Sequence, residues 1–172
     1  YRSSLLVEQP NEDLAYVIGR QFLFDSYHLL LLEKLVDSND ENIAAIARKS
    51  IKEVRYHLRF SSEWVKRLGD GTQESHDKMQ KAIDYLLAYA GELTTPVEVE
   101  KEAAKTGYGV DPEQLKEIYR QNVKETLAEA TLSIPEIDWS HSGGKSGIHS
   151  EHFGYILADL QYMQRAYPKM AC

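Results

Sequence analysis

Apolar residues recur every three or four positions along most of this chain, the spacing that places them on one face of an α-helix. The repeat is clearest between residues 10 and 37, where a proline and early acidic residues also favour a helical first turn. Comparable stretches predict helices over residues 40–68, 75–93, 112–132 and 147–167, with a shorter helix after Pro96. No alternation of Val, Ile and Thr suggests a strand. The pattern predicts an all-α fold, a bundle of long antiparallel helices joined by short turns.

Composition narrows the class of protein without changing this picture. With 172 residues, 42% of them hydrophobic, the chain can bury one core, so we expect a single domain over residues 1–172. Its net charge of −7 argues against nucleic acid as a partner. The one cysteine, Cys172, leaves no disulfide framework, and the longest apolar run, residues 29–32, is too short to cross a bilayer. We therefore expect no membrane partner and a cytoplasmic location.

Two acid–histidine pairs stand out as candidate metal ligands. Asp25 and His28 are three residues apart in one predicted helix, and Glu53 and His57 are four apart in the next. Side chains at either spacing lie on one helix face, so each pair can converge on a metal ion. If the turn lies near residues 38–39, Asp25 and Glu53 should lie at nearly the same height and be bridged by a hydrogen bond, a base or water. This is the outline of half of a carboxylate-bridged di-metal site.

The outline departs from a complete di-iron site. Such a bundle uses a Glu from each of two helices and Glu-x-x-His from each of the other two. Here Tyr56 occupies the position of the expected histidine, the first acid is the shorter Asp25, and no second helix pair repeats the arrangement. Two interpretations remain open. Asp25, His28, Glu53 and His57 are either a degenerate remnant that binds no metal or the ligands of a working site.

The loop GGKSG, residues 143–147, resembles a phosphate loop only superficially. The nucleotide-binding pattern requires two glycines separated by four residues before Lys-Ser, and a preceding strand. Neither feature is present. We interpret the segment as an ordinary polar loop, flexible or ordered by a partner, before the last helix.

Several longer segments, in this order, resemble a known family. They are LLVEQPN, IKEVRYHLRFSSEWVKRLGDGT, VDPEQL and GGKSGIHSEHFGYILADLQYMQR. Together they resemble the C subunits of bacterial phenylacetyl-CoA epoxidases, multicomponent ring-oxygenating monooxygenases of phenylacetate degradation. The resemblance covers essentially the whole chain. It implies a ferritin-like bundle and predicts that this chain, which opens on Tyr1 rather than Met, lacks the first two helices of the family.

The resemblance also implies a role. In this family the catalytic A subunit holds the di-iron centre, and the C subunit supports it without a cofactor of its own. We therefore expect a non-catalytic subunit that binds the A subunit. The alternative is a self-contained ferritin-like oxygenase that uses the four residues named above as ligands.

A pocket for the CoA thioester near the contact between the A and C subunits is a further implication. Two segments are candidates for it by position. They contain Tyr1, Arg2 and Ser3, and Lys101, Glu102 and Ala103. Missing helices would also leave apolar surface uncovered on the first long hairpin, so we expect a large contact with the A subunit. The last predicted helix and the 143–147 loop are a second candidate surface for this contact.

Overall fold

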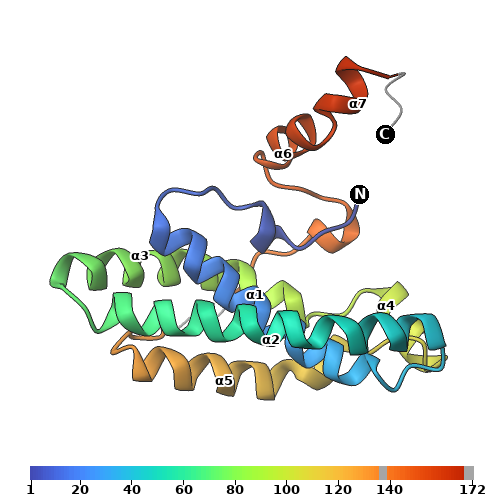
Figure 1. Cartoon of the computed structure of the whole chain (residues 1–172), viewed down its shortest axis with the longest axis horizontal. Helices are drawn as coiled ribbons and strands as arrows, with labels where there is room; N and C mark the ends of the chain where they lie inside the picture. Colours follow the sequence, from blue (N-terminus) through green and yellow to red (C-terminus); the bar gives the residue numbers. More distant parts are fainter. Residues whose placement is uncertain (136–138, 169–172) are drawn as a thin grey trace.

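Asp and Thr side chains set the beginnings of the three longest helices. The computed structural model describes residues 1–135 and 139–168. The α-helices are α1 (Leu14–Leu35), α2 (Glu41–Gly69), α3 (Gln73–Ala90), α4 (Glu98–Lys105), α5 (Lys116–Glu129), α6 (Phe153–Leu160) and α7 (Tyr162–Ala166) (Figure 1). Asp13, Asp40 and Thr72 accept hydrogen bonds from the first free backbone N–H groups of α1, α2 and α3. Because Asp13 caps α1, this helix begins at Leu14 and not near residue 10.

Short 3₁₀ turns join or precede several of the helices. They are η1 (Leu5–Glu8), η2 (Gly91–Thr94), η3 (Pro112–Leu115) and η4 (Gly144–Ser146). η3 leads directly into α5, and the Asp111 side chain caps η3 at the start of the helix predicted over residues 112–132. No strand occurs among the described residues, so the all-α prediction is confirmed for them. None of the described helices combines the length and the apolar character that a membrane crossing requires.

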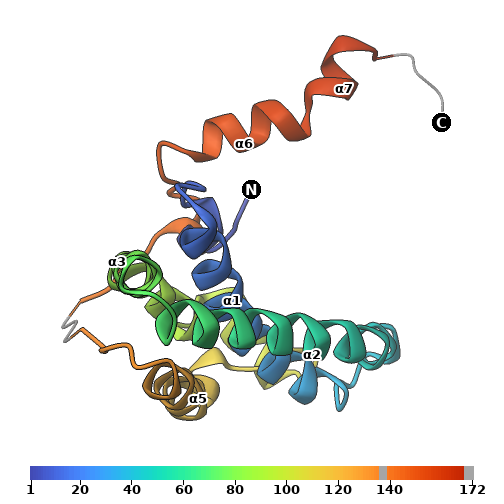
Figure 2. The same ribbon diagram turned by 60° about the vertical axis from the view of Figure 1, so that its left-hand side comes forward.

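Four helices enclose the main hydrophobic core. α1 and α2 form a long antiparallel hairpin, with α3 and α5 packed beside it (Figures 1 and 2). The core side chains come from the apolar stripes that the periodicity predicted. They include Phe22 and Leu23 of α1, Val65 of α2, Met79, Ile83 and Leu86 of α3, and Val123 and Leu127 of α5. A smaller cluster around Leu32, Ala47 and Val54 closes the far end of the α1–α2 hairpin.

The C-terminal region differs from the single helix predicted over residues 147–167. It begins with a non-helical stretch and then forms α6 and α7, separated at Gln161. Gly147 adopts a left-handed backbone (φ 90°), which interrupts any helix there, and α6 begins at Phe153, after Ser150 has donated its backbone N–H to Glu8. We call residues 153–167 the C-terminal arm. It projects away from the bundle, and neither of its helices contains a buried residue (Figure 2).

Candidate functional site

The first candidate centre lies where α1 meets α2. Asp25 is buried there, with 2% of its surface exposed. Its Oδ1 accepts a hydrogen bond of 2.7 Å from Nε2 of Gln21, one turn earlier in α1. Its Oδ2 lies 3.4 Å from the Oγ of Ser61 on α2. The Ser61 hydroxyl also lies 3.0 Å from the carbonyl oxygen of His57, and its single proton can serve only one acceptor at a time.

Glu53 is not part of this centre, so the predicted pairing of Asp25 with Glu53 is wrong. Glu53 is exposed to solvent. The partner of Asp25 across the hairpin is Ser61, eight residues further along α2, or roughly 12 Å at 1.5 Å per residue. The Glu33–Arg55 ion pair, 3.2 Å long, shows a displacement in the same direction.

Contacts with a distant segment hold the turn between α1 and α2. The turn is tied to the segment after α4, because the backbone N–H of Asn39 donates to the carbonyl of Gly107 at 2.9 Å. Ser38 also donates to the carbonyl of Tyr108. The prediction assumed a symmetrical turn level with both helix ends. The turn is instead held by a segment 67 to 70 residues away, which the local sequence does not reveal.

Two histidines, His28 and His57, lie near Asp25. Burial is the largest cause of the pKa shifts of Asp25 and His28. Burial raises the pKa of Asp25, opposed by the hydrogen bond from Gln21 and by the nearby His57 and His28. Burial likewise lowers the pKa of His28, against the attraction of Asp25. Both shifts favour the uncharged forms. The arrangement is therefore a polar cluster that avoids net charge between two helices.

The donor set does not fit a di-iron centre. The group offers one carboxylate and two imidazoles, whereas the bundle sites described above use four carboxylates and two histidines. Both oxygens of Asp25 already lie within hydrogen-bonding distance of Gln21 and Ser61. Over residues 1–135 and 139–168, three or more His, Cys, Asp and Glu side chains nowhere converge in a way that could hold a metal ion.

A second polar centre, which the sequence pattern hardly indicates, forms around Glu8. The Glu8 carboxylate is buried, and it joins the N-terminal segment to the residues before the C-terminal arm. Its Oε1 accepts a hydrogen bond from Oγ of Ser3 at 2.8 Å and lies 2.6 Å from Nδ1 of His149. Its Oε2 accepts hydrogen bonds from the backbone N–H and the hydroxyl of Ser150. Despite burial, these hydrogen bonds lower the pKa of Glu8. We call this group the Glu8 clamp.

A second buried carboxylate, Glu92, holds the 143–147 loop. Its oxygens accept hydrogen bonds from the backbone N–H groups of Leu5 and Gly143, both at 2.7 Å, and from that of Lys145 at 3.2 Å. The Lys145 ammonium in turn pairs with Glu100 of α4 at 2.7 Å and donates to the carbonyl of Thr95. We call this group the Glu92 clamp. Contacts within the chain therefore order this loop, whereas from the sequence we expected it to be flexible or ordered by a partner.

Each clamp had only a weak signal in the sequence. Glu8 follows three apolar residues in LLVEQP, and Glu92 lies in GELTTP directly after the last apolar turn of α3. An acid in such a setting needs partners if it is buried. The partners of Glu8 and Glu92 come from positions up to 142 residues away, so spacing arguments could not identify them.

The first predicted substrate-binding segment is used mainly within the chain. The Tyr1 ring meets Phe153 edge-on at 5.9 Å, and its hydroxyl accepts a hydrogen bond from Gln161. Ser3 binds Glu8 through its hydroxyl and Gly144 through its backbone N–H. Arg2 is exposed. This segment therefore supports the arm, and its binding role stays a prediction.

The second predicted segment lies on α4. Lys101 pairs with Glu98 at 2.9 Å, and Glu102 lies 3.6 Å from Lys105. The Ala103 carbonyl accepts backbone hydrogen bonds from the loop that follows α4. None of the described contacts joins Lys101, Glu102 or Ala103 to the Tyr1–Ser3 segment directly. The two segments only approach the same loop, through Gly144 on one side and Lys145 with Glu100 on the other.

An open cleft of about 420 Å³ lies between the C-terminal end of α3 and α5. The α5 side of the cleft contains three cationic side chains spaced one helical turn apart, Lys116, Arg120 and Lys124. Two of these cations are near acids of their own helix region, Lys116 with Glu113 and Arg120 with Glu117. The cleft therefore suits an anionic group, with competition from these acids.

Two comparisons with known proteins agree with one another. The family model described as "Phenylacetic acid catabolic protein" matches residues 1–171. The C subunit of the 1,2-phenylacetyl-CoA epoxidase from Escherichia coli (strain K12) is 44% identical over 168 residues. That similarity covers 98% of this chain and 68% of the relative.

Proposed function

Because this chain belongs to the phenylacetic acid catabolic protein family, we propose that it is a non-catalytic subunit of a phenylacetyl-CoA epoxidase. The observation that carries this proposal is the 44% identity with the C subunit of such an enzyme across nearly all of the chain. Being a subunit of such an assembly, the chain has other subunits as partners. We assign the catalytic A subunit, with its di-iron centre, as the direct partner, and the cytoplasm as the location.

The donor set around Asp25 supports a structural role. With Glu53 in solvent, Asp25 accepts a hydrogen bond from Gln21 and lies 3.4 Å from the Ser61 hydroxyl, so it serves as a polar contact between α1 and α2. In this proposal the chain supplies no cofactor, and the oxidation takes place in the A subunit. This chain contributes by binding the A subunit and by stabilising the active form of that subunit.

Contact with the CoA thioester belongs to the same proposal. The Tyr1–Ser3 segment and residues 101–103 remain its candidates. Ser3 contacts Gly144 in the loop that contains Lys145, and Glu100, next to residues 101–103, pairs with Lys145. The cations on α5 are suitable for phosphate groups, but they line a different cleft. Substituting Arg2 or Lys101 by Ala should raise the KM for phenylacetyl-CoA if these segments contact the substrate.

The alternative, a self-contained oxygenase, is favoured by one observation: Asp25, His28 and His57 do lie close enough to influence one another's charge. Reconstitution separates the two functions. The chain alone, the A subunit alone and the mixture are assayed with phenylacetyl-CoA, a reductase and oxygen. We expect product from the mixture only, unchanged in rate by a His57→Ala substitution in this chain. Turnover by the chain alone, abolished by that substitution, would establish the alternative.

A further inference from the structure

Residues 1–8 lie directly against residues 143–150, although the hydrogen bonds that join them span 141 and 142 positions of the chain (Figures 1 and 2). The backbone N–H of Ser3 donates a hydrogen bond to the carbonyl of Gly144 at 3.2 Å. A Cβ at Gly144 would collide with the carbonyl oxygen of Ser3 and would lie 3.0 Å from the backbone nitrogen of Leu5. Glycine is therefore required for the two backbones to approach this closely. We call these two stretches together the clamped unit.

Each buried carboxylate holds both stretches of the clamped unit. Glu92 accepts hydrogen bonds from the backbone N–H of Leu5 in the first stretch and from that of Gly143 in the second, both at 2.7 Å. Glu8 belongs to the first stretch and accepts a hydrogen bond of 2.8 Å from the backbone N–H of Ser150 in the second. The departure of either stretch therefore breaks hydrogen bonds of both carboxylates. Because a buried carboxylate without donors is costly, the loss of one contact favours the loss of the others.

Two further anchors mark the limit of the clamped unit on the side of the bundle. The Leu6 side chain is fully buried in the main hydrophobic core, so the first stretch is more than a frayed segment. Gln9, the residue after this stretch, is also buried, and its Oε1 accepts a hydrogen bond of 2.6 Å from the hydroxyl of Tyr85 on α3. The rest of the main core comes from residues outside the unit. The bundle can therefore stay folded when the unit opens.

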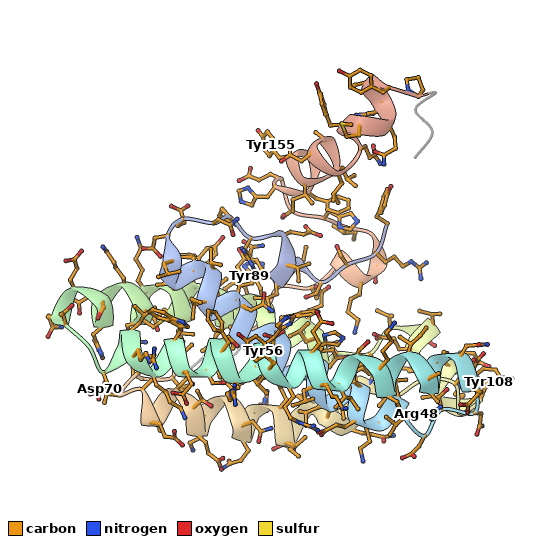
Figure 3. All side chains as sticks on the ribbon, viewed as in Figure 1. Arg48, Tyr56, Asp70, Tyr89, Tyr108 and Tyr155 are labelled. Atoms are coloured by element: carbon orange, nitrogen blue, oxygen red, sulfur yellow. The ribbon has the colours of Figure 1, made fainter. Side chains whose placement is uncertain are left out.

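Contacts with the clamped unit position the C-terminal arm. The His149 ring stacks on Phe153, the first residue of α6, with ring centroids 3.8 Å apart. The Tyr1 ring meets the same phenylalanine edge-on at 5.9 Å, and the Tyr1 hydroxyl accepts a hydrogen bond from Gln161. Figure 3 shows the Tyr155 side chain on α6, beyond the bundle. When the unit opens, the arm loses these contacts.

We propose that the clamped unit opens and closes as one cooperative element while the four-helix core stays folded. Proteins open in contiguous cooperative units, whose free energies of opening lie between zero and that of global unfolding. Here the two carboxylates and the Ser3–Gly144 contact supply the cooperativity, because each of them joins both stretches. The inference concerns a motion of this chain alone, so it goes beyond the proposed function and does not depend on it. The opposing possibility is that the two stretches loosen independently of one another.

Native-state hydrogen exchange of the wild-type chain tests this cooperativity. The informative amides are the four backbone N–H groups that bind Glu8 or Glu92. They are those of Leu5, Gly143, Lys145 and Ser150. Measured at rising urea concentrations, they should share one opening free energy and one urea dependence, with protection factors about tenfold or more below those of the core amides of Phe22 and Ile83. Separate opening free energies for the two stretches, or protection equal to that of the core, would overturn the inference.

A substitution in one clamp should also weaken the other. Glu8→Gln removes the charge of the Glu8 clamp and leaves Glu92 unchanged. We expect the protection of the Gly143 and Lys145 amides, which Glu92 binds, to fall by about tenfold, because hydrogen bonds to a charged group contribute more than neutral ones. Glu151→Gln, whose side chain is 87% exposed, is the matched control and should change their protection by less than about twofold. Unchanged protection of these two amides in Glu8→Gln would show that the clamps are independent and would overturn the inference.

A second pair of variants leaves both carboxylates in place. A Cβ at Gly144 should push the two stretches apart. Gly144→Ala should therefore lower the protection of the Leu5 and Ser150 amides, which bind different carboxylates, by the same factor of about tenfold or more. Gly154→Ala is the control, since its Cβ would meet nothing within 4 Å, and it should leave both amides within about twofold of wild type. Loss of protection at only one of the two amides in Gly144→Ala would contradict the inference.

Discussion

Nδ1 of His149 lies 2.6 Å from Oε1 of Glu8, 141 positions earlier in the chain. This contact closes the N-terminal segment onto the base of the C-terminal arm. The carboxylate is 1% exposed and the imidazole 15%, so water can scarcely replace either partner. The pair is therefore a structural joint between the two ends of the described chain, and changes to it should affect stability as well as the position of the arm.

The Glu8 clamp can be weakened with a minimal change in shape. Glu8→Gln keeps the volume of the side chain but removes the charge that His149, Ser3 and Ser150 stabilise. We expect a loss of about 2–3 kcal/mol in the free energy of unfolding, because hydrogen bonds to a charged group contribute more than neutral ones. Urea denaturation measures this loss. Glu151→Gln, whose side chain is 87% exposed, is the matched control and should change stability by less than about 0.5 kcal/mol.

The same clamp should respond to acid. Its hydrogen bonds hold the pKa of Glu8 below the ordinary value of 4.5. A lowered pKa in the folded state means that the stabilisation is complete above pH 4.5 and is lost as the pH falls through the folded pKa. The stability difference between wild type and Glu8→Gln should therefore shrink below pH 4.5. A difference that stays constant down to about pH 3 would contradict this assignment.

Asp25 should show the opposite dependence. Burial raises its pKa above the ordinary value of 3.8, so the unfolded chain ionises first as the pH rises and the folded state loses stability. Asp25→Asn removes this penalty and keeps an acceptor for Gln21, while its amide NH2 takes the place of the other oxygen and can donate to the hydroxyl oxygen of Ser61. We expect the variant to be more stable than wild type by roughly 0.5–1 kcal/mol at about pH 7 and equal to it below pH 3.8. Denaturation at both pH values checks the sign, and a destabilised variant at neutral pH would refute it.

Two glycines test the contrast between the bundle and the arm. A Cβ at Gly69 would collide with the carbonyl oxygen of Ala130, whereas one at Gly154 would meet nothing within 4 Å. Gly69→Ala should cost about 1–3 kcal/mol, because the backbone must shift. Gly154→Ala should leave the thermal midpoint unchanged and increase helicity slightly, since Ala favours a helix by about 0.5–1 kcal/mol over Gly. Circular dichroism with thermal unfolding measures both effects.

Iron content distinguishes the remnant from a working site. After purification with added Fe(II), we expect less than one iron per chain, since Glu53 lies in solvent and both Asp25 oxygens have hydrogen-bonding partners. Elemental analysis provides the measurement, with His57→Ala as the comparison. One or more irons per chain, lost in this variant, would identify the cluster as a metal site.

The sequence by itself determined the helices and the faces they bury. Helix periodicity acts over a few residues, so it can be identified without knowing where the chain goes next. The exact helix starts were less certain, because the cap at Asp13 places the start of α1 after the one that Pro10 suggested. The family was also within reach, because the similarity to it extends over nearly the whole chain.

Only the tertiary structure decided which residues meet. Asp25 meets Ser61 and not Glu53, in a hairpin whose turn is held at Asn39 by a distant segment. Glu8 likewise meets His149, and the last predicted helix is interrupted and left uncovered. The local sequence indicates whether a residue favours a helix or a turn. The partner of a buried charge, in contrast, depends on the path of the whole chain. That path is fixed by the sum of many long-range contacts, none of which has a local sequence signal.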